Sequence, residues 1–339
     1  MEGQDRLIQT GGMRPQCKQP LRGRGGGKYT FCMPLDEFLA SVNIAAFFNE
    51  PMSRHTTFRT GGPADVCVPI GKAPVKDVAA LLRHARSRAI PVQIIGGGAN
   101  VVVADAGIRG ITIDTRVSGT PPVRGGAVFT VPAGMSCDEA AELAAEKSLS
   151  GMEFMAALPG TIGGAIWMNA RCWGKSVSDV LLGVEALDGD FNPVFEPFNA
   201  SEWAYKKSPY QNKNTLILSA DFRLAHGGAA EIRGRMAEYR LEREAKGHFR
   251  YPSAGSVFKN NPVFGKSSGK IIDELGLRGL RIGGACVADW HGNFIVNTGG
   301  ASSSDIRALT LKIQSEARSR LGIELEPEIL FIGDWQPDY

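Results

Sequence analysis

The sequence predicts an α+β protein of about two or three domains. Its 339 residues exceed the usual size of a single small domain. Apolar runs of strand length alternate with segments of helical periodicity, and 42 glycines and 19 prolines predict many turns between short elements. Because 43% of the residues are hydrophobic and 22% are charged, the disordered and fibrous classes are excluded.

Net charge and cysteine usage limit the classes of partner. A formal net charge of +3 is too small to predict a nucleic-acid partner, although it allows a locally basic pocket for an anionic ligand. The six cysteines have no C-x-x-C spacing, and no histidine or carboxylate cluster has metal-ligand spacing, so we predict reduced thiols and no metal site. No apolar run reaches the roughly 18 residues of a membrane span and no signal-peptide core is present, so we expect a cytoplasmic protein without membrane contacts.

The first part of the chain combines a polar leader with one short helix. Residues 1–33 are basic, glycine-rich and without apolar periodicity, so we expect a flexible basic extension. Residues 34–49 predict an amphipathic helix whose apolar face carries Leu35, Phe38, Leu39 and Val42.

A β-α-β unit follows. Apolar runs at 65–70 and 91–95 predict two strands. Between them a helix is predicted by apolar residues that share one face, namely Val75, Val78, Leu81, Leu82 and Ala85.

A glycine-rich turn at 96–100, with the sequence G-G-G-A-N, connects this unit to a strand at 101–105. Small residues let successive backbone amides converge on one anion, which is how glycine-rich loops hold phosphate. The G-x-G-x-x-G spacing is absent, and β-branched residues continue as a strand where a nicotinamide-binding Rossmann domain would begin a helix. The turn therefore indicates either a pyrophosphate site or a plain hairpin.

A second glycine-rich segment, residues 151–170, follows a helix expected at 137–147. Its glycines alternate with large apolar residues, as expected where backbone packs against a flat aromatic ligand. The alternative is the start of a helix packed closely on a sheet.

The remaining segments predict a sheet and then a mixed C-terminal part, with a domain boundary near residue 224. Strands are expected near 180–186, 193–195 and 215–224. A long charged helix is expected over 229–246, with Ile232, Met236 and Leu241 buried. The last elements are a helix near 270–275, a strand at 293–297 and a helix over 305–321 capped by Ser302, Ser303 or Ser304.

Residues 251–262 gather a hydroxyl, an ammonium and amides on a backbone rich in small residues, in Ser256, Lys259 and Asn260. Near the C-terminus, Glu326 and Glu328 flank a proline ahead of an apolar run. Both stretches are candidates for catalytic chemistry, and a solvated turn is the alternative for each. We interpret His291 as a loop histidine bonded to backbone rather than as a general base.

The order of these motifs is more specific than any one of them. G-G-G-A-N, L-P-G-T-I-G-G-A-x-x-M-N-A, Y-K-K-S, P-S-A-G-S-V-F-K-N, H-x-N-F-I-V-N and L-E-P-E-I-x-F-I-G follow one another over about residues 50–334. This series closely resembles the UDP-N-acetylenolpyruvoylglucosamine reductases, in the subclass lacking the tyrosine-bearing loop. The resemblance implies a vanillyl-alcohol-oxidase-type FAD-binding domain of two α/β subdomains, 34–115 and 116–224, and a C-terminal α+β substrate-binding domain, 225–339.

The resemblance also implies roles for residues. Ser256 matches the serine that gives a proton to the carbon intermediate, Glu328 the catalytic glutamate, and Lys206 the position of an arginine that polarises the substrate carboxylate. Substrate would be bound by Tyr205, Arg243, Lys259 and Asn260. FAD would be bound by Thr57, Arg59, Gly96, Gly97, Gly98, Ala99, Asn100, Leu158, Pro159, Gly160, Thr161, Gly163, Gly164 and Ala165.

The implied reaction uses NADPH to reduce FAD. Hydride then passes from flavin N5 to C3 of UDP-N-acetylglucosamine enolpyruvate, and C2 takes a proton from Ser256. The product is UDP-N-acetylmuramate for peptidoglycan synthesis, and the enzyme is expected to be a monomer. Lysine at 206 keeps the charge of arginine but not its planar fork. Arg171, Cys172 and Trp173 replace the small residues usual in a G-A-Y-G turn, and Leu330 replaces a basic residue. These departures leave open another FAD-dependent oxidoreductase with a different substrate, or a binder of nucleotide sugars that is not an enzyme.

Overall fold

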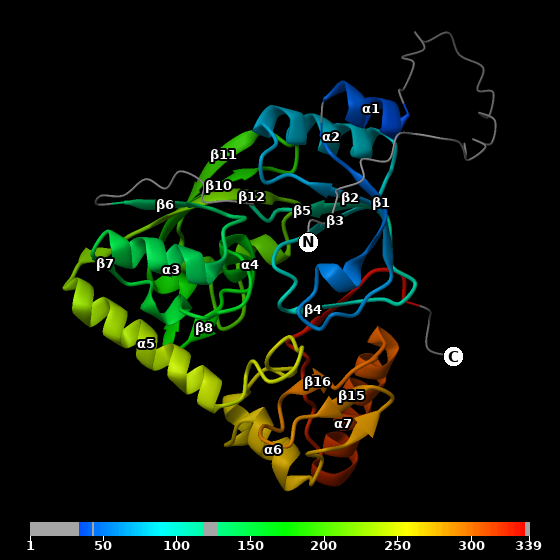
Figure 1. Cartoon of the computed structure of the whole chain (residues 1–339), viewed down its shortest axis with the longest axis vertical. Coiled ribbons are helices and arrows are strands. Elements are labelled where there is room, and N and C mark those ends of the chain that lie inside the picture. Colours follow the sequence, from blue (N-terminus) through cyan, green and yellow to red (C-terminus); the bar gives the residue numbers. More distant parts are fainter. Residues whose placement is uncertain (1–33, 43, 118–127, 336–339) are drawn as a thin grey trace, which may run out of the picture. The chain divides into compact units, whose positions relative to one another are not determined.

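The computed structural model describes residues 34–42, 44–117 and 128–335. The elements below belong to one compact unit, residues 35–339, in which three groups of strands and helices follow one another along the chain (Figure 1). The extension predicted at 1–33 lies outside the described residues. No helix in the described ranges combines the length and the apolar character that crossing a membrane requires.

The first group is a four-stranded sheet with the strand order β1-β2-β5-β3. Its strands are β1 (Phe47–Pro51), β2 (Pro63–Pro69), β5 (Ile108–Asp114) and β3 (Val92–Ile95). β1 is antiparallel to β2, whereas β2 and β3 are both parallel to β5. Helices α1 (Leu35–Ser41) and α2 (Val75–Ser87) pack together on this sheet through a core that includes Leu39, Leu81 and Val68 (Figure 1). The predicted β-α-β unit is confirmed as β2, α2 and β3.

The helix predicted over residues 34–49 is wrong in its C-terminal half. Helix α1 ends at Ser41, whose hydroxyl donates to the carbonyl oxygen of Phe38 at 2.7 Å. The chain then forms β1, in which Phe47 lies opposite Cys67 of β2. Pairing with a distant strand therefore outweighs the local helical periodicity.

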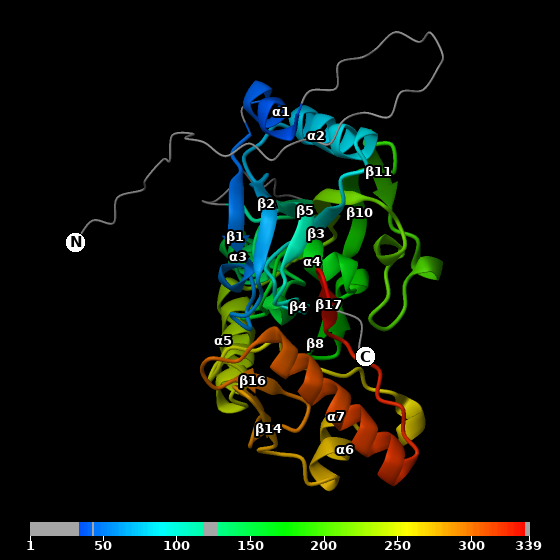
Figure 2. The same ribbon diagram turned by 90° about the vertical axis from the view of Figure 1, so that its right-hand side faces the viewer.

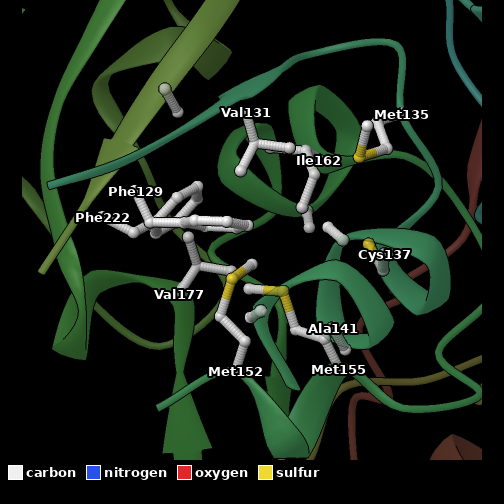
Figure 3. Packing of buried hydrophobic residues seen from close by; sticks show 14 of the residues in the cluster. Phe129, Val131, Met135, Cys137, Ala141, Met152, Met155, Ile162, Val177 and Phe222 are labelled. Atoms are coloured by element: carbon white, nitrogen blue, oxygen red, sulfur yellow. The ribbon is translucent and has the colours of Figure 1, made fainter. Parts of the chain in front are cut away.

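The second group is an antiparallel sheet with the strand order β11-β10-β12-β6. Its strands are β11 (Pro193–Pro197), β10 (Leu181–Leu187), β12 (Leu216–Phe222) and β6 (Phe129–Pro132). Helices α3 (Cys137–Glu146), α4 (Ile162–Trp167) and α5 (Ala229–Ala245) share its core, where Phe129, Phe222 and Met152 meet (Figure 3). Short strands pair as β7 (Leu149–Ser150) with β13 (Ala225–His226) and β8 (Arg171–Cys172) with β9 (Lys175–Ser176).

Helix α5 buries a different residue from the one predicted. Ile232 and Met236 are buried in the core of the second group, as predicted, but Leu241 is 64% exposed and Arg243 is 5% exposed. At about 100° per residue, Leu241 lies about 140° from Met236 around the helix, whereas Arg243 lies within about 20° of it. The apolar stripe thus continues into a buried arginine, which a search for apolar periodicity does not detect.

The third group contains β14 (Arg281–Ile282), β15 (Ala285–Val287) and β16 (Ile295–Asn297) with helices α6 (Ser268–Glu274) and α7 (Ser303–Leu321). α7 begins slightly earlier than predicted, because Ser302 accepts the Asp305 amide at 3.0 Å and Asp305 accepts the Ser302 amide in return. The chain then returns to pack against the first group, where β17 (Leu330–Ile332) pairs parallel with β4 (Val101–Val103) in a separate two-stranded sheet (Figure 2). Short 3₁₀ helices are η1 (Met52–Arg54), η2 (Glu153–Met155), η3 (Val177–Asp179), η4 (Ala200–Glu202), η5 (Pro209–Gln211) and η6 (Pro262–Phe264).

Candidate active site

A cavity of about 1870 Å³ lies where loops of the three groups meet. The first group contributes the turn 96–100, the second contributes the segment 157–174, and the third contributes residues 252–256 and Glu328. All of the predicted FAD-binding residues line it, as do Ser256, Lys206, Glu328, Tyr205, Arg243 and Asn260. The structure therefore brings nearly all of the predicted site residues to one place.

Two glycine-rich loops form one wall of the cavity by packing backbone against backbone. A Cβ atom on Gly97 would lie 2.6 Å from Cα of Gly160, and one on Gly96 would lie 2.4 Å from Oγ1 of Thr161. Gly98 has a φ of +61°, and a Cβ atom there would lie 1.9 Å from the carbonyl oxygen of His55. Side chains at Gly96 or Gly97 would push the two loops apart, and one at Gly98 would push its loop away from His55, so these close contacts require glycine.

The first loop offers backbone donors to a ligand. Among the residues that the structure describes, the amides of Gly97, Gly98, Ala99 and Asn100 have no hydrogen-bond acceptor, although these residues line the cavity. Thr57 fixes the loop from behind, since its amide and hydroxyl both donate to the carbonyl oxygen of Gly98, at 3.1 and 3.3 Å. A run of free amides on a fixed, side-chain-free backbone fits the pyrophosphate of a dinucleotide.

A lysine and a glutamate face each other in the cavity. Nζ of Lys206 lies 2.5 Å from Oε1 of Glu328, and the side chains are 13% and 12% exposed. Lys206 has a φ of 57° in a tight turn, where Ala204 and Lys207 exchange backbone hydrogen bonds of 3.2 and 3.0 Å. That conformation is rare for a residue with a side chain, so neighbouring contacts must maintain it. Gln211 contributes by donating to the carbonyl oxygen of Lys206 at 3.0 Å.

Backbone contacts place Glu328 beside Ser256. The amide of Glu328 donates to the carbonyl oxygen of Val257 at 2.7 Å, and its own carbonyl oxygen accepts Nδ2 of Asn100 at 2.9 Å. Ser256 forms a β-bridge with Phe294, and its hydroxyl has no hydrogen-bond partner among the described residues. A hydroxyl, a carboxylate and an ammonium thus converge from three distant parts of the sequence.

The predicted substrate residues divide into two sets. Asn260 lines the cavity, and its Oδ1 accepts the amide of Ser268 at 2.9 Å. Tyr205 and Arg243 also line the cavity. Lys259 does not line it, because its ammonium pairs at 2.5 Å with Glu326, whose side chain is 69% exposed.

Cys172, Trp173 and His248 line the cavity as well and were not predicted as site residues. Burial lowers the pKa of His248 to about 4, and the positive charge of Arg243 contributes. For Cys172 and Trp173, the departure from the G-A-Y-G pattern was the signal in the sequence that could have identified them as site residues. The interpretation of His291 as a loop histidine is confirmed, since its Nδ1 accepts the backbone amide of Asn293 at 3.1 Å.

A second titratable cluster supports the glycine loop from outside the cavity. His55 lies 3.2 Å from Asp114 and 3.0 Å from Glu50. Potential ligand atoms of His55, Cys67 and Asp114 all lie within 4.8 Å of one another, so the three side chains are grouped closely enough to hold a metal ion. Their spacing along the sequence did not predict this grouping. Arg116 already pairs with Asp114 at 2.6 Å, so the buried carboxylate is neutralised by protein groups.

Comparison with known proteins connects this site to one family. A family model described as "FAD binding domain" matches residues 73–190, and one described as "UDP-N-acetylenolpyruvoylglucosamine reductase, C-terminal domain" matches residues 247–332. The α+β architecture with an FAD-binding domain and a C-terminal domain is therefore confirmed.

Relatives match along most of the chain. The UDP-N-acetylenolpyruvoylglucosamine reductase of Treponema denticola is 42% identical over 305 residues, which cover 85% of this chain and 94% of that protein. The enzyme of the same name from Caldanaerobacter subterraneus is 38% identical over 288 residues, covering 85% and 94%. The crystal structure of the Thermus caldophilus reductase matches with a TM-score of 0.69 and 30% identity, covering 85% of this chain and 99% of that one. The chain belongs to the UDP-N-acetylenolpyruvoylglucosamine reductase family.

Proposed function

We propose that this protein is an FAD-dependent, NADPH-consuming reductase that converts UDP-N-acetylglucosamine enolpyruvate to UDP-N-acetylmuramate in peptidoglycan precursor synthesis. The observation that carries the proposal is the convergence of Ser256, Lys206 and Glu328 in a cavity walled by two glycine-rich loops. Relatives that bear the reductase name over nearly their whole length support it.

The residues present fit FAD. The free amides of Gly97, Gly98, Ala99 and Asn100 would hold its pyrophosphate, and Leu158, Gly160 and the start of α4 would border the ring system. When bound, FAD supplies hydride transfer between NADPH and the enolpyruvyl double bond.

Lys206 stabilises the charge that develops on the carboxylate side of the substrate when hydride adds to C3. Such charge stabilisation is usually the largest single catalytic contribution. The left-handed turn and Gln211 keep the lysine in position before substrate arrives. Because lysine lacks the planar fork of arginine, we expect it to contribute charge more than alignment.

Ser256 donates the proton that C2 collects. A serine hydroxyl is a weak acid and needs a proton source behind it. When the substrate carboxylate approaches Lys206, it competes with Glu328 for one ammonium. Glu328 lines the same cavity as Ser256 and is anchored to the carbonyl oxygen of the next residue, Val257, so we assign it the role of passing a proton toward Ser256. Lys259 does not line the cavity and has no part in this relay.

Tyr205, Asn260 and Arg243 would contact the nucleotide-sugar part of the substrate. We further propose that the protein works in the cytoplasm as a monomer.

The test is the visible spectrum of purified protein and of Ser256→Ala, before and after NADPH and after the enolpyruvyl substrate. We expect a yellow wild type that NADPH bleaches and the substrate restores to yellow. Ser256→Ala should retain its colour and its bleaching but turn over about a hundredfold more slowly, the usual scale of lost acid catalysis. Bleached wild-type protein that the substrate does not reoxidise would favour a different acceptor, which the departures at Lys206 and Cys172 leave open.

A further inference from the structure

Arg243 is buried at the end of the cavity formed by α5 and the β8–β9 hairpin. It lies in the last turn of α5, is 5% exposed and lines the cavity. One helical turn earlier, Tyr239 stacks on Trp173 of the hairpin with ring centroids 4.7 Å apart and an interplanar angle of 6°. Cζ of Arg243 lies 5.9 Å from the centre of the same indole. The stacked rings thus join helix and hairpin beside the guanidinium.

The hairpin has a rigid turn that places Cys172. Arg171 pairs with Ser176 and Cys172 pairs with Lys175, which leaves Trp173 and Gly174 as the turn residues. Their φ angles are 53° and 77°. Two successive positive φ angles are typical of the tight type I′ turn, so Cys172 occupies a defined position on a short strand.

The partners of Arg243 carry no negative charge. One terminal nitrogen donates to Sγ of Cys172 at 2.7 Å, and the other lies 3.4 Å from Nδ1 of His248. Its Nε is buried without a hydrogen-bond partner. Within the described ranges no carboxylate pairs with Arg243, whereas Lys206 pairs with Glu328 and Arg235 with Glu153.

Both neighbours are held in their neutral forms. Burial raises the pKa of the Cys172 thiol, against the influence of Arg243, so the sulfur remains a thiol at neutral pH. The lowered pKa of His248 keeps its imidazole neutral, with a lone pair available on the nitrogen that faces Arg243. A buried cation without a counter-ion is unfavourable unless a ligand supplies the negative charge.

We propose that Cys172 and His248 are positioning residues that hold the guanidinium of Arg243 in the cavity without neutralising it, so that a phosphate of the nucleotide substrate becomes its counter-ion. The proposal rests on the proposed function for the identity of the ligand, a nucleoside diphosphate. It assigns a role to Cys172, which departs from the G-A-Y-G pattern of this hairpin, and to His248, which follows α5. It also explains why no carboxylate among the described residues pairs with Arg243, although its side chain is the most deeply buried arginine that lines the cavity.

The experiment compares Cys172→Asp with the matched control Cys172→Ser in FAD-loaded protein. UDP and uridine are the probes, and their dissociation constants are measured by calorimetry. Cys172→Asp places a carboxylate beside Arg243, so we expect UDP to bind at least about tenfold more weakly while uridine binding is unchanged. Cys172→Ser retains an uncharged acceptor and should bind UDP within about threefold of wild type. In steady-state assays, the loss should appear in KM for the nucleotide sugar rather than in kcat.

Unchanged UDP binding by Cys172→Asp would overturn the proposal, and so would an equal loss for UDP and uridine, which would indicate general disruption of the cavity. If Cys172→Asp does not fold, His248→Asp makes the same test from the other side of the guanidinium, with His248→Asn as its control. A failure of the proposed function would give a different result from a failure of this proposal. In that case the wild type would still prefer UDP over uridine, through the Arg243 site, but would not reduce the enolpyruvyl sugar.

Discussion

Two arginines near the cavity show how charge can be used in opposite ways. Arg116 donates to both oxygens of Asp114, which His55 also contacts, and His55 in turn contacts Glu50. Among the described residues, Arg243 has only a thiol and an imidazole as hydrogen-bond partners. The first guanidinium is fully compensated by the protein, whereas the second retains its charge for a ligand.

The two arginines differ because the cluster around Arg116 supports the cofactor loop, whereas Arg243 is placed to bind a ligand. The carbonyl oxygen of His55 contacts Gly98, so the compensated cluster holds the loop that offers free amides to the cofactor. A structural cluster must be satisfied before any ligand binds, because an unpaired buried charge would destabilise the fold. Arg243 instead has no carboxylate partner among the described residues, and the cost of burying its charge is recovered only when the ligand arrives.

The largest effect is expected for Asp114→Asn. The change leaves Arg116 and His55 without their carboxylate in a region where Asp114 is 4% exposed, and it should lower the free energy of unfolding by about 3 kcal/mol. Urea unfolding measures the loss. Asp65→Asn is the matched control, because the side chains of the Asp65–Arg109 pair are 38% and 48% exposed and the loss of this pair should cost less than about 1 kcal/mol. Equal effects for the two variants would contradict the structural role of the cluster.

Arg243→Met should have the opposite pattern of effects, with a large loss of ligand affinity and a small change in stability. UDP affinity should fall by about thirtyfold, or about 2 kcal/mol, because the phosphate loses its counter-ion. The free energy of unfolding should change by less than about 1 kcal/mol, since no carboxylate is left unpaired. Calorimetry with UDP and urea unfolding measure the two quantities. A loss of stability as large as that of Asp114→Asn would show that Arg243 is also a structural cation.

Gly98→Ala tests the connection between the compensated cluster and the cofactor loop. The new methyl group would lie 1.9 Å from the carbonyl oxygen of His55, on a backbone with a φ of +61°, so the loop must shift. We expect FAD to bind about tenfold more weakly, a change of about 1.4 kcal/mol, in an otherwise folded protein. Flavin fluorescence during titration of the apoprotein gives the dissociation constant.

Gly189→Ala is the control for that experiment. A Cβ atom there would meet no other atom within 4 Å, its φ is not in the left-handed region, and Gly189 does not line the cavity. If both variants bind FAD as tightly as wild type does, the contact between His55 and Gly98 does not position the loop.

The smallest effect is the pH dependence of stability. Burial alone would raise the pKa of Asp114, but hydrogen bonds from His55 and Arg116 outweigh it and lower the pKa to about 2. The cluster therefore stabilises the fold above pH 3.8, and this contribution is lost as the pH falls toward 2. The hydrogen bond to Asp114 raises the pKa of His55 despite burial, so the contribution of His55 is complete below pH 6.5 and is lost as the pH rises through the raised value.

Urea unfolding between pH 2 and 9 separates these contributions from those of other groups. At the acid end of this range, the free energy of unfolding of the wild type should fall by about 1 kcal/mol or more beyond the fall seen for Asp114→Asn. At the alkaline end, this additional fall should be smaller. Parallel curves for the two proteins would mean that the cluster does not titrate as described.

The sequence predicted the parts of the site that depend on local chain properties. Small residues at 96–100 and 158–165 identified the two loops, because close backbone contact excludes side chains wherever it occurs. The motif order placed Ser256 and Glu328 in the same site. Local periodicity failed at residues 47–49, where pairing with β2 decides the structure, and at Leu241, where the buried stripe of α5 continues into Arg243.

The amino-acid sequence by itself determined the family, the two glycine-rich loops and most of the residues around the cavity, since these depend on side-chain size and motif order along the chain. Only the tertiary structure decided which charges meet. Lys206 pairs with Glu328 and Arg243 meets Cys172 across long stretches of sequence, while Lys259 pairs with Glu326 and leaves the cavity. The physical reason is that an ion pair forms wherever folding brings its partners together, and spacing along the chain does not encode that meeting.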